Sequence, residues 1–466
     1  MKVVFIGGGA HRYLSISRSI LADAKVVDGG EINVYDLNTE RSELMANMIR
    51  TTPEYHANPC TISHGTSLEE ALDGADVVTV VLFAADRKKY EMSLMICGKH
   101  GFIGSDQLSP SGAILAMQGA PILLDIAKKM EKLCPKATLL NFANPAAVLS
   151  GAVSNHTSIR CLGVCAGFSN HLWDLNRVLG EDSNENHFEV SCVGVNHLSF
   201  IGSDSKYKNA NLFETLAAAV HDDWKLPDLS GRWSDSSIAN IKNSVTKFVD
   251  LYRKYGEWVF STEGDGLAHL DIEHGYNKTA ANIATSTEKS IDDTVAKMKT
   301  ERDQDNEHFA SYLNSDDETR WTGDRPETNS LGRADDNIMS QCIKALAGAG
   351  AFRVATSMLN QGAVPGFPDR NVMEFTQIID KDSIRPVEGL KVPDIFHGLI
   401  GALAQHQTLL GDAIATRDPE ILFKALYSYP VKQDNAESKA LWRDLLQHAA
   451  TDIPEEFQHT REMFEK

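Results

Sequence analysis

Short apolar runs alternate with segments of helical periodicity in the first third of the chain. Residues 2–6 are apolar from Val3 onward and largely β-branched or aromatic, which predicts a buried parallel strand. Similar runs predict strands at 31–35, 76–82 and 137–142, and the intervening patterns predict helices at 67–75 and 113–133. This alternation predicts an α/β fold with an N-terminal Rossmann-type doubly wound parallel sheet.

The pattern becomes mainly helical after about residue 200. Helices are expected at 238–255, 281–314, 340–347 and 393–417. Residues 371–375 break the helical pattern and predict a strand, while 316–329 is charged and predicts a solvated connection. We therefore expect two domains. Residues 1–198 form the sheet domain, and residues 199–466 form a larger, mostly helical α+β domain that carries the substrate site.

Composition restricts the partners and the compartment. The 466 residues include 64 acidic and 45 basic side chains, and the net charge of −19 argues against nucleic acid or an anionic membrane as a partner. The seven cysteines form no CxxC pair, which favours reduced thiols in a cytoplasmic enzyme. The first strand begins at residue 2 and no uninterrupted apolar run reaches 18 residues, so neither a signal peptide nor a membrane span is expected.

A glycine-rich turn follows the first strand. Gly7 and Gly9 allow a tight turn and the close approach of a pyrophosphate to the next helix, so we expect the segment to bind a dinucleotide. The binding segment continues through Ala10, His11 and Arg12, and Arg12 stands where the full fingerprint has a third glycine. The second strand ends at Asp36, whose carboxylate favours the ribose of NAD over a 2′-phosphate. The alternative role for Asp36 is a turn or helix-capping residue.

Three polar side chains close later apolar segments. Asn144 precedes Pro145, Cys165 ends Gly163-Val-Cys165, and His197 ends Gly194-Val-Asn196-His197. Ligands of open α/β sheets bind at the carboxyl ends of the strands, so these side chains are expected beside the cofactor. A thiol and an imidazole suit a borderline divalent metal. The alternatives are a small buried hydrophobe for Cys165, a core histidine for His197 and a turn residue for Asn144.

The order of these motifs resembles the NAD- and divalent-metal-dependent glycoside hydrolases of family 4. The resemblance covers nearly the whole chain. It is carried by Ile6-Gly-Gly-Gly9, Asn144-Pro145, the segment ending at Cys165, Asn196-His197, the segment Asn360 to Asp369 with Val372-Met-Glu374, and Ile384-Arg385-Pro386.

The resemblance implies an activity and its cofactors. In that family NAD oxidises the sugar hydroxyl at carbon 3, a base removes the proton at carbon 2, and the aglycone leaves by elimination before water adds and the hydride returns. Cys165 and His197 occupy the metal positions, with Mn first and Ni, Co or Fe as alternatives. A carbohydrate substrate and a homodimer or homotetramer are implied as well.

The resemblance also suggests residues for catalysis and substrate binding. The segment from Tyr255 to His269 resembles the part that carries the family's base, and Asp265 or Tyr255 is the expected proton acceptor. Asp106 lies in a loop that resembles one near the substrate, although a surface turn is the alternative. The residues expected to contact the substrate are Asn144, Asn196, Arg87 and His269.

Two departures from the family pattern affect the expected chemistry. Relatives carry Asp, Asn or His after the metal cysteine, whereas this chain has Ala166, with His171 as a candidate substitute. The segment Leu82 to Lys89 matches the family's phosphate-binding strand end poorly, which favours an unphosphorylated glycoside or glycuronide. An NAD-dependent sugar or 2-hydroxy-acid dehydrogenase or epimerase without net hydrolysis remains the alternative function.

Overall fold

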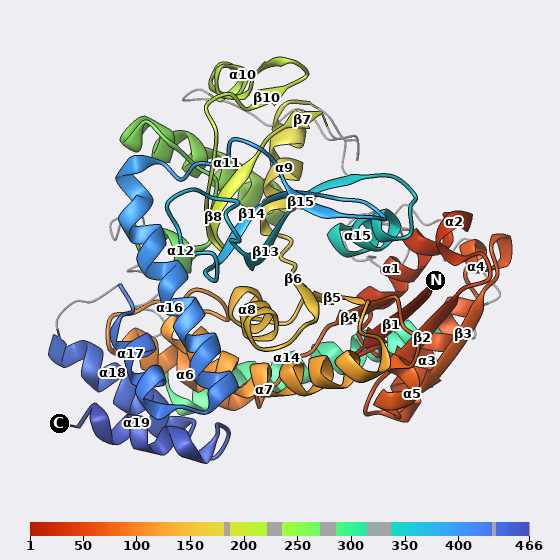
Figure 1. The fold of residues 1–466 in the computed structure, drawn as a ribbon, viewed down its shortest axis with the longest axis horizontal. Coiled ribbons are helices and arrows are strands. Elements are labelled where there is room, and N and C mark those ends of the chain that lie inside the picture. The colour runs from red at the N-terminus through yellow and green to blue at the C-terminus, as the bar shows by residue number, and fades with distance from the viewer. Residues whose placement is uncertain are drawn as a thin grey trace.

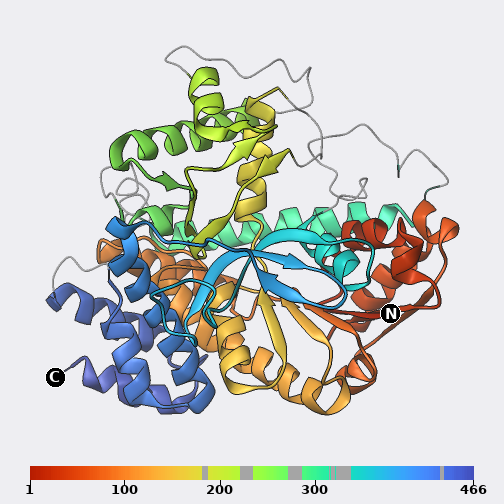
Figure 2. The same ribbon diagram turned by 45° about the horizontal axis from the view of Figure 1, so that its top comes forward.

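A computed structural model describes residues 1–180, 187–220, 235–270, 286–313, 315, 321, 337–430 and 435–465. Its centre is a mixed sheet of 12 strands (Figures 1 and 2). The parallel part has the order β3-β2-β1-β4-β5-β6, which is the expected Rossmann-type arrangement. These strands are β1 (Lys2–Ile6), β2 (Glu31–Tyr35), β3 (Thr61–Gly65), β4 (Val77–Val80), β5 (Thr138–Asn141) and β6 (Arg160–Gly163).

The sheet continues beyond β6 as antiparallel strands in the order β13-β14-β8-β9-β12, with β15 also paired to β14. These strands are β13 (Phe352–Leu359), β14 (Val372–Ile379), β8 (Cys192–Val195), β9 (Leu198–Ile201), β12 (Trp258–Val259) and β15 (Ile384–Pro386). A separate small sheet contains β7 (Phe188–Glu189), β10 (Lys206–Tyr207) and β11 (Ala210–Asn211). One sheet therefore crosses the boundary expected at residue 198, and the two-domain division stays a prediction.

Helices pack on both faces of the parallel strands, and further helices extend the fold beyond the antiparallel part. In the first half they are α1 (Arg12–Leu21), α2 (Ala24–Val27), α3 (Thr39–Arg50), α4 (Pro53–Ala57), α5 (Leu68–Leu72), α6 (Arg87–Lys99), α7 (Pro110–Leu133), α8 (Ala146–His156), α9 (Gly167–Val178) and α10 (Leu212–Ala219). In the second half they are α11 (Asp235–Tyr255), α12 (Gly264–Leu267), α14 (Glu288–Ser311), α15 (Ile338–Leu346), η2 (Asp394–Phe396), α16 (His397–Thr416), α17 (Pro419–Tyr427), α18 (Asn435–His448), η3 (Glu455–Phe457) and α19 (Gln458–Met463).

The predicted helices and strands are present with small shifts at their ends. The helix expected at 113–133 begins three residues earlier, because Ser109 caps it and Pro110 takes its first position. The helix expected at 393–417 is a short 3-10 turn, η2, followed by α16. Residues 281–285 of the expected helix 281–314, and all of 316–329 except Trp321, lie outside the described residues. Arg87, expected in a loop after a strand, is instead the first residue of α6.

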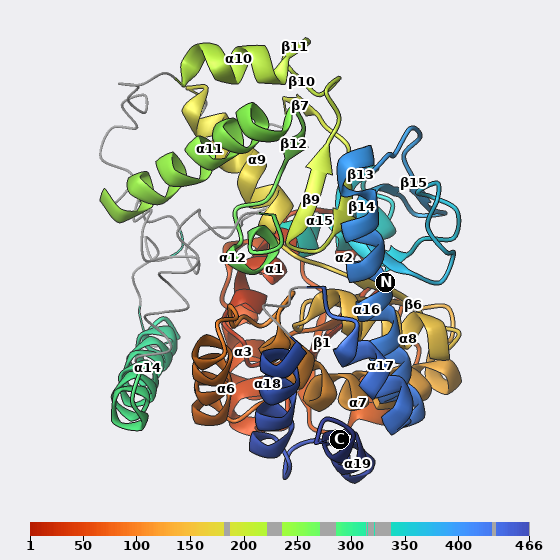
Figure 3. The same cartoon turned by 90° about the vertical axis from the view of Figure 1, so that its left-hand side faces the viewer.

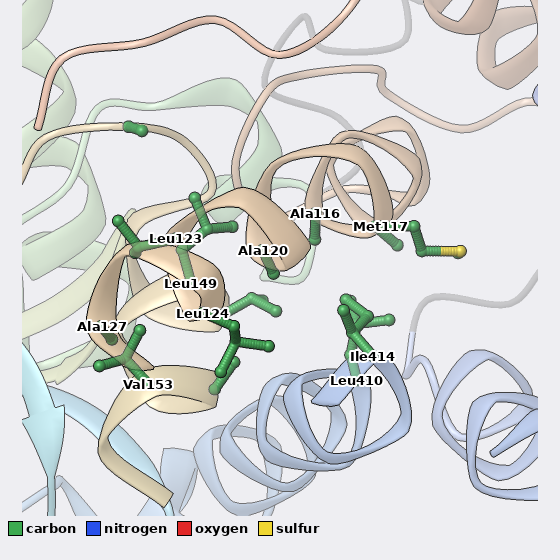
Figure 4. Close-up of a cluster of buried hydrophobic side chains, with 14 of the residues drawn as sticks. Ala116, Met117, Ala120, Leu123, Leu124, Ala127, Leu149, Val153, Leu410 and Ile414 are labelled. Atoms are coloured by element: carbon green, nitrogen blue, oxygen red, sulfur yellow. The ribbon is translucent and has the colours of Figure 1, made fainter. Parts of the chain in front are cut away.

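Helix α7 forms the centre of the largest core. Its apolar residues recur every three or four positions and meet α8 and α16 (Figure 4). The labelled side chains of this contact are Ala116, Met117, Ala120, Leu123, Leu124, Ala127, Leu149, Val153, Leu410 and Ile414. Among the described helices, α7 alone is long and apolar enough to cross a membrane. However, 78% of its most apolar 18-residue stretch is buried inside the protein. It is a core helix here.

The two ends of the chain lie on opposite sides of this core. The N-terminal strands lie at the right of Figure 1, and α17, α18 and α19 cover the lower left. Helix α14 lies beside α6, as Figure 3 shows with α14 nearly end-on. It contributes the buried Phe309 to the core around α1.

Candidate active site

The glycine-rich turn after β1 closes against two neighbouring strand ends. Gly7 has a φ of +72°, and a Cβ there would lie 1.9 Å from the carbonyl oxygen of Val81, so only glycine fits. The Asp36 carboxylate accepts hydrogen bonds from the amides of Gly9 at 2.9 Å and Asn38 at 2.9 Å. Asp36 therefore lies at the turn, as expected for a ribose-binding acid, and it also has the bonds of a turn residue.

The three residues after this turn lead into α1. Ala10 donates its amide to the carbonyl of Gly7 at 3.0 Å, and the ring of His11 stacks on Phe309 at 4.3 Å between centroids. The guanidinium of Arg12 lies 4.4 Å from the ring centroid of Phe142, just past the end of β5. A cavity of about 390 Å³ opens beside Arg12, with Phe142, Ala166 and the first turns of α9 and α15 in its walls.

Cys165 and His197 meet at the carboxyl end of β6 and the turn after β8. A hydrogen bond with Cys165 is among the contacts of the His197 side chain. The backbone of His197 is left-handed, with a φ of +69°. Gly266 packs directly against it: a Cβ at position 266 would lie 1.7 Å from the His197 carbonyl oxygen, so a glycine is required at position 266. Cys165 is partly exposed, unlike the five buried cysteines, so it is not a core hydrophobe.

The imidazole of His197 is held from behind by Asp265. Asp265 Oδ1 lies 2.9 Å from Nδ1 of His197, which leaves Nε2 as the ring nitrogen available on the Cys165 side. Burial alone would lower the pKa of His197, but the charge and hydrogen bond of Asp265 outweigh burial and raise that pKa well above its usual range. A carboxylate on the far nitrogen is the usual support of a metal-binding histidine.

This donor set fits a divalent metal with an open coordination shell. A soft thiolate and an oriented imidazole are two protein ligands, and among the described residues they belong to no group of three or more metal-binding side chains. The remaining positions would be available for substrate oxygens and water. The geometry therefore favours a catalytic site over a closed structural site.

All four lone-pair directions of the Asp265 carboxylate are occupied. Besides His197, Oδ1 accepts the amide of Gly266 at 3.0 Å, and Oδ2 accepts the Ser105 hydroxyl at 2.6 Å and the Leu108 amide at 2.8 Å. The side chain is 2% exposed. Burial alone would raise the pKa of Asp265, but His197 and the other donors outweigh it and hold that pKa far below the usual range. Asp265 is an ionised anchor for His197.

A second network connects the loop before α7 to the end of β5. The Asn144 amide nitrogen donates to Asp106 Oδ2 at 2.6 Å, and its oxygen accepts from the Gln107 amide at 2.6 Å. Gln107 in turn accepts the Ala146 amide at 2.9 Å. Asn144, which precedes a cis Pro145, is therefore fixed by side chains and not only by its turn. Asp106 Oδ1 accepts no hydrogen bond within the described part of the chain.

The other predicted residues have partners outside the Cys165–His197 pair. The Tyr255 hydroxyl donates to the Leu270 carbonyl at 2.9 Å. His269 is half-buried by exposed area, and desolvation of its ring lowers its pKa to about 4. Its Nε2 lies 3.3 Å from the Tyr429 hydroxyl. Arg87 forms an ion pair with Glu91 at 2.7 Å and covers the rings of Phe83 and Tyr90.

Ser105, Gln107, Glu374 and Glu263 were not named as site residues from the sequence. Glu374 is buried and accepts a hydrogen bond from the predicted Asn196 at 2.8 Å, which fixes the turn that carries His197. Ser105 and Gln107 belong to the same glycine-bounded loop as Asp106, and Glu374 belongs to the Val-Met-Glu segment. The family resemblance had pointed to both segments, although not to these residues. Glu263 lies in the segment from Tyr255 to His269 that the resemblance singled out, but only the fold shows its contact with His171 at 3.2 Å.

Comparison with known proteins agrees with this geometry. The model of the family 4 glycosyl hydrolases matches residues 2–181, and the model of the C-terminal domain of the same family matches residues 192–431. An alpha-galacturonidase of Thermoanaerobacter italicus is 24% identical over 96% of both chains, and an alpha-galactosidase of Bacillus subtilis is 21% identical over 91% of both chains.

A solved structure of a 6-phospho-beta glucosidase from Thermotoga maritima, with manganese, NAD+ and glucose-6-phosphate, has the same fold. Its TM-score is 0.72 at 19% identity, and the match covers 97% of this chain and 99% of that one. The two family models together span most of the chain. The strand-end turn, the Cys165–His197 pair and these matches agree: the chain belongs to family 4 of the glycosyl hydrolases, and it is a glycosidase.

Proposed function

We propose that this protein hydrolyses unphosphorylated glycosides of a uronic acid, using NAD and a divalent metal, with manganese as the first candidate. The observation that carries the proposal is the Cys165–His197 pair, held by Asp265 at the strand ends beside the glycine-rich turn. Two alpha-galacturonidases resemble the chain over 96% of its length, which supports a uronate as the sugar.

The cofactors would be held by residues already in position. The turn from Gly7 to Arg12 would receive the pyrophosphate of NAD, and Asp36 its ribose. Cys165 and His197 would bind the metal. When bound, NAD supplies a reversible hydride acceptor for carbon 3 of the sugar, and the metal supplies a Lewis acid for the sugar oxygens.

The chain's own residues would position the sugar and move its carbon 2 proton. Asn144 is fixed by Gln107 and Asp106, so its amide can align a sugar hydroxyl beside the metal site. We assign Asp106 as the first candidate base, because its Oδ1 accepts no hydrogen bond from the described residues. Asp265 uses all its acceptor positions on His197 and the loop, which supports a positioning role. Tyr255 is the second candidate base.

The substrate carboxylate would meet a cation near the end of β4. Arg87 is 43% exposed and lies over the rings of Phe83 and Tyr90, a surface that suits a sugar ring with an anionic substituent. Asn196 and His269 would complete the sugar-binding wall. We also propose a cytoplasmic location, which the cysteines support because all of them are free in the structure. We propose a homodimer or homotetramer as well, to be tested by light scattering during size-exclusion chromatography.

The test is aglycone release from nitrophenyl glycosides and glycuronides. Release that requires both NAD and Mn, is lost in Cys165→Ser, and leaves bulk NADH absorbance flat would support the proposal. Equal rates without NAD would contradict the redox route. A preference for galactosides over galacturonides would contradict the uronate assignment.

The alternative is an NAD-dependent sugar or 2-hydroxy-acid dehydrogenase or epimerase. Ala166 favours it, because an alanine cannot protonate a departing aglycone at the position where relatives carry a polar group. Stoichiometric accumulation of NADH without aglycone release would support this alternative. The family match makes it the weaker candidate.

A further inference from the structure

A histidine–carboxylate pair, His171 and Glu263, lies beside Cys165 and has no role so far. Nε2 of His171 on α9 lies 3.2 Å from Oε1 and 3.3 Å from Oε2 of Glu263. The imidazole packs edge-on against Phe248 and Phe260. The His171 side chain is 6% exposed and that of Glu263 is 19% exposed, so the carboxylate is the more accessible half of the pair.

The carboxylate of Glu263 lies next to Cys165, above a residue that has no side chain. A Cβ placed on Gly167 would lie 2.7 Å from Glu263 Oε1 and 3.7 Å from Cys165 Sγ. The oxygen therefore fills the space that a side chain at position 167 would need, one residue from Ala166. No hydrogen bond or ion pair of the described residues joins the His171–Glu263 pair to Cys165 or His197.

The carboxylate and the imidazole share one hydrogen. Nε2 of His171 lies within hydrogen-bond distance of both Glu263 oxygens, and Oε2 also accepts the Thr262 amide at 2.8 Å. The charged or titratable groups near the pair include Lys247 on α11, Glu374 on β14, Cys192 on β8, and Asp174 and Arg177 on α9.

Glycoside cleavage needs a proton carrier at this place. The departing aglycone oxygen must gain a proton when its bond to carbon 1 breaks, and the water that then adds to carbon 1 must lose one. Ala166, which directly follows Cys165, can do neither. A carboxylate supplied from another segment, with a histidine behind it, can do both.

We propose that Glu263, with His171 as its proton store, protonates the leaving aglycone and deprotonates the incoming water. In the first step the imidazolium form of His171 gives its Nε2 proton to a Glu263 oxygen, Glu263 passes a proton to the aglycone oxygen, and the carbon 1–oxygen bond breaks, which leaves His171 neutral. In the second step the water oxygen bonds to carbon 1 while Glu263 takes a proton from that water, and this proton passes to His171 and restores the imidazolium. The proton count closes over one turnover. The inference rests on the proposed glycoside cleavage.

The test compares two aglycones in Glu263→Gln, because an acid catalyst matters most for a poor leaving group. We expect kcat/KM on a methyl glycuronide to fall by about 10²- to 10³-fold and on a 4-nitrophenyl glycuronide by less than about 5-fold. Exchange of the carbon 2 hydrogen with deuterated water should stay at the wild-type rate, since that step precedes loss of the aglycone. His171→Gln should show the same selectivity for the good leaving group.

Glu257→Gln, in the same segment and outside the site, is the matched control. It should leave kcat/KM unchanged for both glycuronides. NAD affinity and the thermal midpoint of Glu263→Gln identify a variant that has failed to fold, in which case His171→Gln decides. Equal losses on both aglycones, or loss of carbon 2 exchange, would overturn the inference. A wild-type enzyme that needs no NAD would instead refute the proposed function and leave the leaving-group comparison valid.

Discussion

Replacement of Asp265 by asparagine tests how the fold prepares His197. An asparagine has the size of aspartate but one acceptor oxygen and a donor NH2, whereas the site presents donors on both sides. If the oxygen faces His197 Nδ1, the Leu108 amide meets the NH2 and stays unsatisfied, at a cost of about 1–3 kcal/mol. If the amide flips, its NH2 donates to Nδ1, and the hydrogen of the imidazole moves to Nε2.

Both arrangements weaken metal binding. Loss of the carboxylate behind a metal-binding histidine typically lowers metal affinity by about 10- to 100-fold, which corresponds to about 1.4–2.7 kcal/mol. We expect a loss of this size when Mn is titrated into Asp265→Asn, with unchanged NAD affinity. Saturating Mn should restore most of the aglycone release, because the proposed role of Asp265 is to position His197.

The control is Asp106→Asn, in which the candidate base is removed and the His197 support is kept. Activity of this variant should stay low at saturating Mn. A Mn affinity of Asp265→Asn within twofold of the wild type would refute the reasoning about His197. Activity of Asp265→Asn that stays lost at saturating metal would identify Asp265 as the base instead.

Three further predictions concern substrate choice, the cofactor turn and acid stability. Arg87→Met should raise KM for a glycuronide and leave KM for the matching glycoside unchanged, and equal changes would contradict the assigned contact. Gly7→Ala should abolish NAD binding in fluorescence titrations, because its Cβ would lie 1.9 Å from the Val81 carbonyl oxygen. Burial lowers the pKa of His269 and of His406 to about 4 in the folded protein, whereas in the unfolded chain both return to the ordinary value near 6.5. Between these pH values the unfolded chain therefore binds more protons than the folded protein. The free energy of urea unfolding should therefore fall between pH 6.5 and pH 4, by up to about 3 kcal/mol per histidine; a flat profile would show that these histidines are already protonated in the folded protein.

The fold was predictable where local pattern and tertiary environment agree. The strands near residues 2–6 and 31–35 are buried on both faces, so their composition alone indicated them. Helix α6 was not predicted, because its first residues form a polar segment directly after β4. Its helical form depends on the Asp86 cap and on packing against α7, α14 and α18. Strand β13 was also missed, since its pairing with β14 and β6 joins residues far apart in the chain.

The sequence by itself determined the ends of the strands and therefore which side chains stand at the reactive edge. Gly7, Asp36, Asn144 and Cys165 follow from that rule, because parallel strands bring their carboxyl ends to one side. His197 does not, because it follows β8, which belongs to the antiparallel part of the sheet. The tertiary structure alone decided which partners these side chains have. Asp265 and Glu263 both come from the segment after β12, yet one is fixed behind His197 and the other beside Gly167. Contacts between residues so distant in the chain depend on packing of the whole sheet, and no local pattern encodes them.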